Sequence, residues 1–238
     1  LSFIFDFYKE HRTGIFLERA AVPGFVGLSS MPWANLGVVD NKGVEISMDY
    51  TQRLAKNVAI TARANLSLNE DKIIEDEQPT QPYPWMEKRG RNVMARYGYI
   101  AEGLFTSEEE IKQHARQFGE SEPGETSRIG DIKYADLNND GAIDQNDMTK
   151  IGRGRVPNLV YGFGVDIQIG NFAIGALFQG THGADVLLSG KSIQPFIGDG
   201  GVGNLYSNIT DRWSADDPTN QNVFYPRLAW GGGDAHNV

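Results

Sequence analysis

The strongest constraint on the fold is a strict alternation of apolar and polar residues along several segments of the chain. Between Val58 and Asn69 every even-numbered residue is apolar, whereas most odd-numbered residues are polar or charged. Residues 44–50 alternate in the same way. A period of two is the period of a β-strand, in which successive side chains point to opposite faces. Each segment therefore predicts a strand with one apolar and one polar face.

Short connections join these segments into hairpins. Residues 53–57 separate the first two alternating segments, and Gly170-Asn171 separates a second pair further along the chain. A two-residue connection that contains glycine is typical of an antiparallel hairpin. The opening residues alternate less regularly and predict one more strand. The sequence thus predicts five strands, at about residues 2–17, 38–52, 57–69, 158–169 and 172–180.

The connections between the predicted strands differ greatly in length. Tight turns alternate with much longer segments, which we expect to be external loops at about residues 18–37, 70–157 and 181–238. Short turns at one end and long loops at the other are typical of a transmembrane β-barrel. A soluble β-sandwich also shows alternating strands, but a loop as long as 70–157 counts against it. The predicted fold class is all-β, a segment of an antiparallel transmembrane β-barrel.

The composition excludes several classes of function. A formal charge of −9 and a pI near 4.9 argue against a nucleic-acid partner, because phosphate binding requires a basic surface. The absence of cysteine excludes disulfides and thiol nucleophiles. No apolar run approaches the ~20 residues of a spanning helix, so a membrane role would fall to strands. The chain opens at Leu1 without the pattern of a signal peptide, and we expect it to be an internal fragment.

An acidic segment from Asp136 to Asp147 follows the pattern of a calcium loop. Calcium takes six to eight oxygen ligands, and a 12-residue loop offers them from positions 1, 3, 5, 7, 9 and 12, with glycine at position 6 for the sharp turn. Gly141 occupies position 6, and position 7 would offer its backbone carbonyl. The predicted ligands, in order, are Asp136, Asn138, Asp140, Ala142, Asp144 and Asp147.

Two features distinguish this segment from an EF-hand. Position 12 is Asp147, one methylene shorter than the usual glutamate, and Pro123, Gly124 and Gly130 disfavour a helix before the loop. We therefore expect a lone loop nearer to the dockerin type, a structural role for calcium, and an affinity on the order of 10⁻⁴ to 10⁻³ M. The alternative is a solvated turn rich in Asp and Asn that binds no metal.

The remaining motifs favour structure over catalysis. Ser107 and Glu110 have the spacing of a capping box, and Ile111, Ala115 and Phe118 recur at helical spacing, which predicts one short amphipathic helix. The acidic residues 108–110 suit a helix start rather than acid–base catalysis. The histidines lack a catalytic motif, and the tryptophans fall in predicted loops, where they pack the loops or stack on a sugar. They are His11, His114, His182 and His236, and Trp33, Trp85, Trp213 and Trp230.

Several segments, in this order, resemble the SusC/RagA-type TonB-dependent transporters of Bacteroidetes outer membranes. The resemblance covers most of the chain and is more specific than the calcium pattern alone. Its segments are Phe5-Asp6-Phe7-Tyr8, Asn41-Lys42-Gly43-Val44-Glu45, Gly103-Leu104-Phe105-Thr106-Ser107-Glu108-Glu109, Gly130-Asp131-Ile132-Lys133-Tyr134, Ile151-Gly152, Pro157, Tyr161-Gly162-Phe163 and Phe178-Gln179-Gly180.

The resemblance implies part of a large barrel of about 22 strands that encloses an N-terminal plug. It also implies outer-membrane lipid as surroundings, a SusD-like surface lipoprotein as lid, and energy delivered by the TonB complex through an N-terminal part that is missing here. The implied cargo is oligosaccharide, or peptide, and the implied protein is not an enzyme. Five strands alone leave open edges, which lipid does not tolerate. Within such a protein, the acidic loop would brace a long external loop near the lid.

Two other functions remain open at this stage. The first is a soluble calcium-binding surface module that recognises glycans. The second is a secreted glycan hydrolase, which needs two carboxylates ~5 to 10 Å apart across one cleft, and no spacing in the sequence indicates such a pair.

Overall fold

A computed structural model describes residues 1–22, 27–190, 192–196 and 205–229. The chain forms two compact units, each built from two stretches of sequence. Residues 1–96 and 152–185 form the first, here called the sheet unit, and residues 97–151 and 186–238 form the second, the loop unit. The His236 and Trp230 considered above lie outside the described residues.

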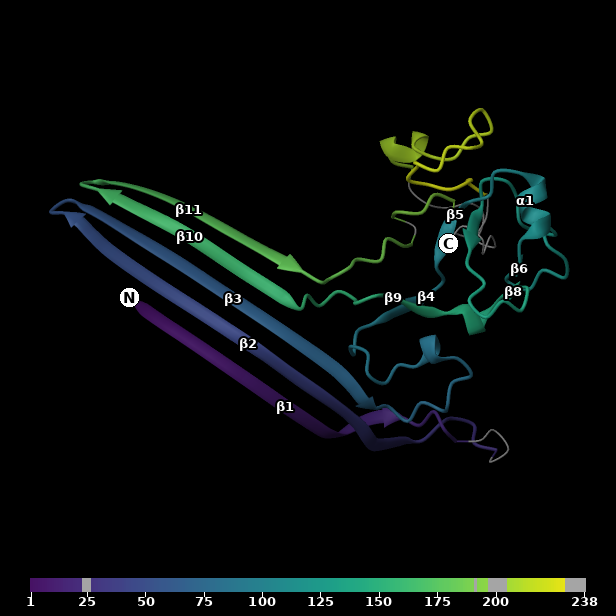
Figure 1. Ribbon diagram of the computed structural model, residues 1–238, viewed down its shortest axis with the longest axis horizontal. Helices are drawn as coiled ribbons and strands as arrows, with labels where there is room; N and C mark the ends of the chain where they lie inside the picture. Colours follow the sequence, from purple (N-terminus) through teal and green to yellow (C-terminus); the bar gives the residue numbers. More distant parts are fainter. Residues whose placement is uncertain (23–26, 191, 197–204, 230–238) are drawn as a thin grey trace. The chain divides into compact units, whose positions relative to one another are not determined.

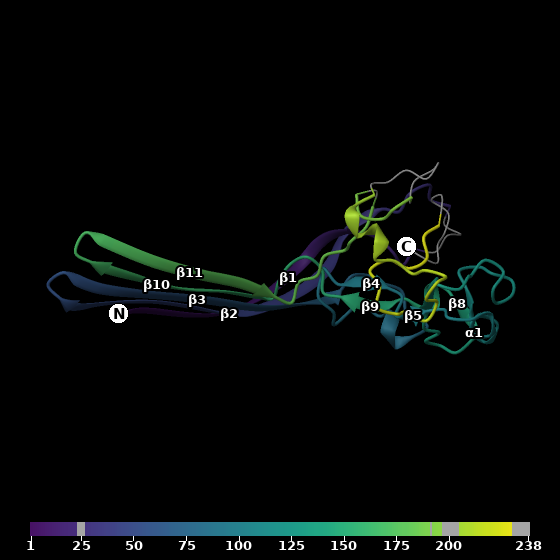
Figure 2. The ribbon, with the colours of Figure 1, turned by 90° about the horizontal axis from the view of Figure 1, so that it is seen from above.

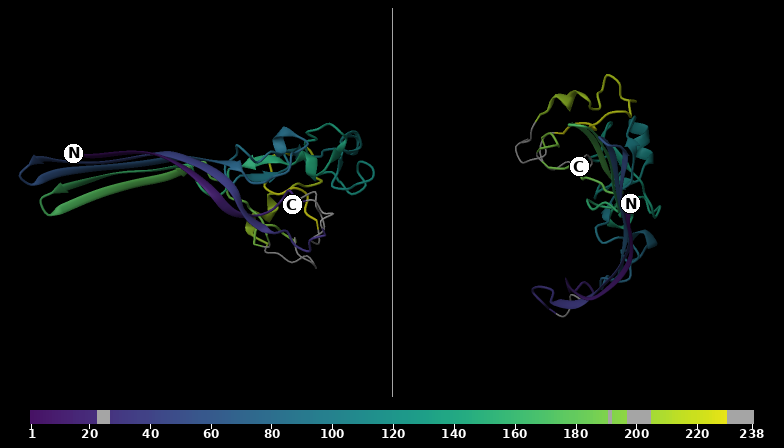
Figure 3. Two further views of the ribbon diagram at one scale, coloured as in Figure 1. Left: turned by 90° about the horizontal axis from the view of Figure 1, so that it is seen from below. Right: turned by 90° about the vertical axis from the view of Figure 1, so that its left-hand side faces the viewer.

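The sheet unit contains one five-stranded antiparallel sheet, which confirms the all-β, antiparallel fold class. The strands lie side by side in the order β1-β2-β3-β10-β11 (Figure 1). Their bounds are β1 Ser2–Glu18, β2 Trp33–Ala55, β3 Val58–Glu75, β10 Leu159–Ile169 and β11 Phe172–His182. Seen along the strands, the sheet is curved rather than flat (Figure 3). Such curvature is the expected result of strand twist.

The first three strands are longer than the alternation predicted. β2 begins at Trp33 rather than near residue 38, so this tryptophan lies in a strand and not in a loop, where it stacks on Phe16 at 5.2 Å between ring centroids. β3 continues to Glu75. Backbone pairing persists here among charged residues, with Asp40 opposite Lys72. An apolar face is therefore not needed for pairing beyond residue 69. This is why the strand predicted from the alternation ended before the observed strand does.

The turns at the short end of the sheet are tight. Only Lys56 and Asn57 separate β2 from β3, two residues instead of the five expected. Gly170 takes a φ of 58° in the turn between β10 and β11, a region that favours glycine. Its amide donates to the carbonyl of Asn57 at 2.7 Å, which ties the two turns together. Near the other end, a register shift follows Arg12, and β1 and β2 bend there (Figure 2).

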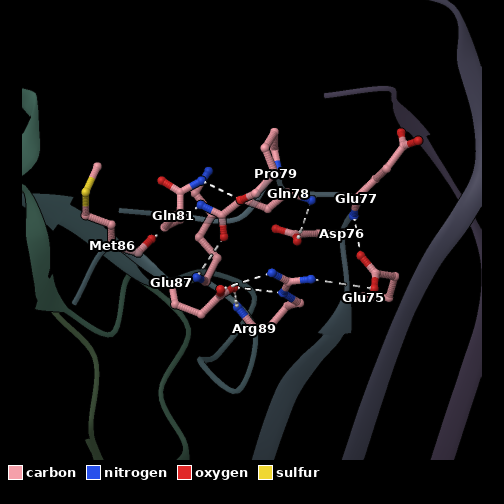
Figure 4. Close-up of polar contacts among 10 residues, drawn as sticks. Glu75, Asp76, Glu77, Gln78, Pro79, Gln81, Met86, Glu87 and Arg89 are labelled. Carbon is pink, nitrogen blue, oxygen red and sulfur yellow. Dashed lines mark hydrogen bonds and ion pairs between the residues drawn. The ribbon is translucent and has the colours of Figure 1, made fainter. Parts of the chain in front are cut away.

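Beyond β3 the sheet unit continues as a polar loop that contains the 3₁₀ turn η2, Pro84–Met86. Figure 4 shows how its side chains hold it. The Gln78 amide donates to the carbonyl of Met86 and accepts from the amide of Lys88. Arg89 donates to Glu87 at 2.8 Å. These local bonds give a defined shape to the start of the long connection after β3.

Short elements build the loop unit. β5 pairs antiparallel with β7, and β6 pairs in parallel with β8, while β4 pairs with β9 where the chain passes between the units. The bounds are β4 Arg96–Gly98, β5 Ala101–Leu104, α1 Glu108–Gln113, β6 Arg116–Gln117, β7 Ile132–Tyr134, β8 Ala142–Ile143, the 3₁₀ turn η3 Gln145–Asp147, β9 Thr149–Gly152 and the 3₁₀ turn η4 Ser207–Thr210. Among the described residues no helix is long and apolar enough to cross a membrane.

The helix α1 is shorter than predicted. Ser107 caps it by accepting the amide of Glu110 at 3.2 Å, but the chain leaves the helix at His114. Ala115 and Phe118 therefore lie outside it, and Phe118 has a φ of 47°. Phe118 instead joins an aromatic cluster with Tyr99 and Tyr134. The core of the loop unit forms from such long-range contacts, with Phe105, Ile111 and Ile143 fully buried.

Candidate functional site

One face of the five-stranded sheet is apolar from edge to edge. The pairing register places Val44 opposite both Phe7 and Leu68, and Leu68 opposite Leu159, so apolar residues of neighbouring strands share each row. The large apolar residues of this face include Phe3, Phe5, Phe7, Val44, Ile46, Met48, Tyr50, Val58, Ile60, Leu66, Leu68, Leu159, Tyr161, Phe163, Val165, Ile167, Ile169, Phe172, Ile174 and Phe178. Many are highly exposed, Phe172 at 78%.

The height of this apolar face matches a bilayer core. The shared rows run from Val58 to Leu68 on β3, which is about ten steps of ~3.4 Å or roughly 34 Å along the strand. A tilt of ~40° reduces this to about 26 Å along the membrane normal, close to the ~25 Å apolar band of outer-membrane barrels. A patch of this size on a soluble protein would be exceptional. The face therefore has the dimensions of a lipid-contacting surface.

The opposite face of the same strands is polar. Arg63 on β3 lies between Asp49 on β2, at 3.9 Å, and Asp166 on β10, at 3.4 Å. The Ser67 hydroxyl donates to the carboxylate of Glu45 at 3.2 Å. All of these groups are exposed, so they remain hydrated and each ion pair contributes little to stability. Hydrated charges of this kind suit the aqueous interior of a barrel.

The loop unit holds the predicted calcium loop in a defined turn. The Asp136 carboxylate accepts the amides of Asp140, at 3.3 Å, and Gly141, at 2.8 Å. Asn138 Oδ1 accepts the amide of Asp140 at 3.1 Å, and Asp140 Oδ1 accepts that of Ala142 at 2.9 Å. Gly141 has the positive φ, 83°, that the sharp turn at position 6 requires. The first four predicted ligands thus gather around one turn.

The second half of the loop returns to its start. Asp144 caps η3 by accepting the amide of Asn146 at 2.7 Å. Asp147 is fully buried, and its two carboxylate oxygens accept the amides of Leu137, at 2.8 Å, and Asp144, at 2.9 Å. Ile143 on β8 is also buried, as an anchor in the core. Asp147 therefore closes the loop through backbone bonds across ten residues.

The predicted ligands of the loop are all oxygen atoms, which are the ligands that a hard cation such as calcium prefers. Its four carboxylates form no ion pair with a lysine or arginine among the described residues, and they accept hydrogen bonds from backbone amides and, at Asp140, from the side-chain amide of Asn138. Their oxygens retain lone pairs beyond those that accept amides. Within the described part of the chain, however, no three His, Cys, Asp or Glu side chains lie close enough together to hold an ion. Calcium binding here stays a prediction.

Two tyrosines near this loop have raised pKa values. Burial, and then the charges of Asp144 and Asp147, raise the pKa of the Tyr99 hydroxyl. Burial, with a smaller contribution from Tyr99, raises the pKa of Tyr134 to about 12. Both hydroxyls therefore stay protonated at neutral pH. Neither residue has the lowered pKa that a general base or nucleophile needs.

The loop unit also depends on two buried carboxylates that the sequence analysis did not single out. Asp131 is fully buried and pairs with Arg227 at 2.7 Å. Burial alone would raise the pKa of Glu120, but hydrogen bonds from the amides of Gln117, Ser127 and Thr126 outweigh it and lower the pKa to about 2. Arg227 is distant in sequence from Asp131, and the partners of Glu120 are backbone amides. Neither carboxylate could therefore be identified from a pattern of residues in the sequence.

The other residues considered for chemistry take structural positions. Glu110 accepts the amide of Thr106 at 2.8 Å and pairs with Lys133, so its carboxylate serves the start of α1. His114 contacts the carbonyl of Tyr134 at 2.8 Å. The Trp213 indole donates to the carbonyl of Pro218 at 3.1 Å. The remaining members of this set also make local contacts: His11 pairs with Asp40, His182 ends β11, and Trp85 stacks on Tyr83.

The sheet defines the class of protein: a segment of the wall of a transmembrane β-barrel, with one lipid-facing and one aqueous face. Comparison with known proteins agrees. The chain is 27% identical to the TonB-dependent receptor P3 of Formosa agariphila over 241 residues, covering 96% of this chain and 22% of the receptor. It is also 27% identical to the TonB-dependent receptor P26 of the same organism, covering 89% and 21%. No protein-family model matches.

Solved structures show the same fold. The RagAB peptide importer in its open-open state matches with a TM-score of 0.65 and 16% identity, over 98% of this chain and 24% of that chain. The RagAB peptide transporter matches with a TM-score of 0.62, over 95% and 23%. These findings confirm the resemblance to SusC/RagA-type TonB-dependent transporters and the location in the outer membrane. The chain spans about a fifth of the length of the curated relatives it matches.

Proposed function

We propose that this chain forms part of a TonB-dependent importer that carries oligosaccharides or peptides across the outer membrane. The observation that carries the proposal is the apolar face shared in register by all five strands, together with a polar face lined by Arg63 and its two acidic neighbours. A wall of this kind separates lipid from an aqueous interior, and barrels of many strands have interiors wide enough for such cargo. The TonB-dependent relatives and the RagAB peptide importer support this proposal.

The proposed partners follow from the same comparison. A SusD-like surface lipoprotein would cover the external end, and the TonB complex would drive transport through a segment outside the present residues. The relation to RagAB, described as a peptide importer, makes peptides as well as oligosaccharides candidate cargo. An enzymatic role is not proposed, because the relatives are named as receptors and the buried carboxylates of the loop unit are held by amides or by Arg227.

The acidic loop has a proposed structural role within the importer. Calcium would be held by Asp136, Asn138, Asp140, Ala142, Asp144 and Asp147, supplying charge neutralisation to a loop that has no cationic side chain of its own. The support is the positive φ of Gly141 and the gathering of three side-chain oxygens around it. An ion there would hold the loop unit in shape near the lid and would not contact cargo.

A soluble glycan-binding module is less well supported. Such a module would have to keep the apolar face in water, where side chains such as Phe172 and Ile174 are 78% and 74% exposed. Burying one such side chain is worth roughly 1.5–3 kcal/mol, so a face of this size would drive aggregation in the absence of lipid.

The importer is tested in the organism that makes the protein. A strain that lacks the gene is compared with the same strain carrying the gene, and the uptake of labelled oligopeptides and oligosaccharides is measured with and without a protonophore. We expect uptake of one cargo class to depend on both the gene and the proton gradient, and a surface lipoprotein to co-purify with the protein. Uptake of every tested cargo at the parental rate without the gene would contradict the proposal.

A further inference from the structure

The ends of β1 and β2 that lie away from the tight turns extend beyond the rest of the sheet as a two-stranded arm, here defined as residues 15–19 and 32–37. β3 ends at Glu75, opposite Val38, so the part of β2 in the arm pairs with β1 alone. Four residue pairs hold the two strands of the arm together. A two-stranded hairpin by itself is at best marginally stable in water. The arm therefore needs contacts with the rest of the sheet unit to keep a fixed position.

Lipid does not hold the arm in place. Phe7 and Val44 form the last row of the apolar face on β1 and β2. Ile15 follows Phe7 by eight residues, which is roughly 27 Å along the strand. Residues 9–12, between these two levels, are all polar or charged. The arm therefore lies in water, where its position depends on its own protein contacts.

The strand pairing is irregular at the base of the arm. Register shifts occur between Arg12 and Ile15 and again between Ile15 and Phe16, and both strands bend there (Figure 2). Gly14 has a φ of 65°, and a side chain at this position would meet nothing within 4 Å. Irregularities of this kind interrupt the ladder of backbone hydrogen bonds. A few residues that can absorb a change of backbone angles are what a hinge requires, and the base of the arm has them.

Among the described residues, one ion pair joins the arm to the rest of the sheet unit. Arg19 donates to the Oε1 atom of Glu77, in the loop after β3, from Nε at 2.7 Å and from Nη2 at 2.5 Å. The pair between Glu87 and Arg89, by contrast, lies within that loop itself. The Glu77 side chain is only 15% exposed, so its carboxylate is largely shielded from water. The Arg19–Glu77 pair, here called the latch, thus links two segments that are 58 residues apart.

Two features of Glu77 oppose the latched state. Its φ of 57° lies in the left-handed region, which is unfavourable for a residue with a side chain. Its Oε2 atom is buried and has no hydrogen-bond partner in the described part of the chain. The ion pair favours the latched state, whereas the backbone strain and the unpaired oxygen favour its release. The two states are therefore closer in free energy than the ion pair alone would make them.

We propose that the arm is a hinged strap with two positions and that the latch holds it in the position described above. Release breaks the Arg19–Glu77 pair, lets the Glu77 backbone relax and allows the arm to turn about the irregular pairs at its base. The arm carries the stacked rings of Phe16 and Trp33, which are 62% and 57% exposed, so its position decides where this aromatic surface lies. The inference goes beyond the proposed function and depends neither on import nor on the identity of the cargo.

The test uses the full-length protein, purified in detergent, with two spin labels whose separation is measured by double electron–electron resonance. One label is attached at Asn35→Cys on the arm and the other at Leu68→Cys on β3, and both positions are exposed. Arg19→Gln and Glu77→Gln each remove the latch. The matched control is Glu87→Gln, which breaks an ion pair in the same loop that does not reach the arm (Figure 4).

The parent should show one main distance and a minor second one. Each latch variant should raise the population of the second distance about fivefold, the upper end for a pair that is exposed on one side. The double variant should match either single variant, because the two groups act as one contact. Added salt should shift the parent in the same direction but leave the latch variants unchanged.

The control should give the distances of the parent. Identical distances in the parent and both latch variants, or an equal shift in the control, would overturn the proposal. The salt series needs no substitution in the latch, so it remains decisive even if a latch variant folds poorly, and a parent that does not respond to salt would also overturn the proposal. Transport is not measured, so failure here is distinct from failure of the importer.

Discussion

Arg227 donates two hydrogen bonds to the carboxylate of Asp131, from Nε at 2.7 Å and from Nη2 at 3.1 Å, across 96 residues of sequence. Asp131 is fully buried and also accepts the amide of Arg128 at 2.8 Å. The Arg227 amide in turn donates to the carbonyl of Gly130 at 2.8 Å. This pair joins the two stretches of sequence that make up the loop unit.

The first prediction concerns this pair. Arg227→Met should lower the local free energy of opening of the loop unit by about 3 kcal/mol, because it leaves the Asp131 carboxylate buried without its cation. Native-state hydrogen exchange of the amides of residues 130–134 measures the effect. Lys133→Met is the control, since its pair with Glu110 is partly exposed on both sides and should contribute about 1 kcal/mol or less. Equal losses in the two variants would show that the burial of Asp131 is unimportant.

A second prediction follows from the lowered pKa of Glu120. Its pKa is about 2 in the folded protein against 4.5 for the free side chain. A lowered pKa means that the stabilisation is fully present above pH 4.5 and is lost as the pH falls toward 2. Its size is about 3 kcal/mol, at roughly 1.4 kcal/mol for each pKa unit. Hydrogen exchange of the Ser127 amide between pH 6 and about 3 should show roughly 2 kcal/mol of this loss, and Glu120→Gln should remove most of the dependence.

Gly130 and Gly119 provide a matched pair for the third prediction. Both have positive φ, 89° and 88°, but a Cβ at Gly130 would lie 2.3 Å from the Trp213 ring, whereas a Cβ at Gly119 would meet nothing within 4 Å. Gly119→Ala should therefore lose only the backbone preference, about 1–2 kcal/mol, and Gly130→Ala considerably more. Protection of the Trp213 amide, which donates to the carbonyl of Tyr225, reports the difference. Indistinguishable protection in the two variants would refute this packing argument.

The fourth prediction tests the two faces of the sheet. Val165 lies on the apolar face near the middle of the band, and Thr61 lies on the polar face at nearly the same level. Val165→Lys should destabilise the folded barrel in lipid by about 2–4 kcal/mol, and Thr61→Lys by much less, because only the first places a charge in hydrocarbon. Urea titration in lipid vesicles measures both. A larger loss for Thr61→Lys would reverse the assignment of the faces.

The fifth prediction concerns calcium. In millimolar calcium, residues 136–147 should resist proteolysis, and a chelator should make them sensitive while the sheet remains protected, since the ion would brace only the loop. Asp136→Asn with Asp140→Asn should be sensitive in both conditions. Glu122→Gln, an exposed change elsewhere in the loop unit, should behave as the parent does. Cleavage that does not respond to the chelator would leave the loop as a metal-free turn held by its own hydrogen bonds.

The strands were the most predictable part of the fold. Alternation at residues 58–69 identified β3 because a strand in contact with lipid on one side and water on the other must repeat every two residues. The same argument failed beyond Asn69, where β3 continues to Glu75 with charged residues paired across the sheet. Backbone pairing there needs no apolar face, so the sequence contains no signal for it. The helix α1 was overextended because helical spacing alone does not reveal where tertiary contacts end it.

The sequence by itself determined the alternation of the five strands, their tight turns, and the order of acidic residues in the loop from Asp136, because these depend on residues close together along the chain. Only the tertiary structure decided that Phe7, Val44 and Leu68 share a row and that Arg227 reaches Asp131. Such contacts depend on register and on long-range closure, which a pattern of neighbouring residues does not encode.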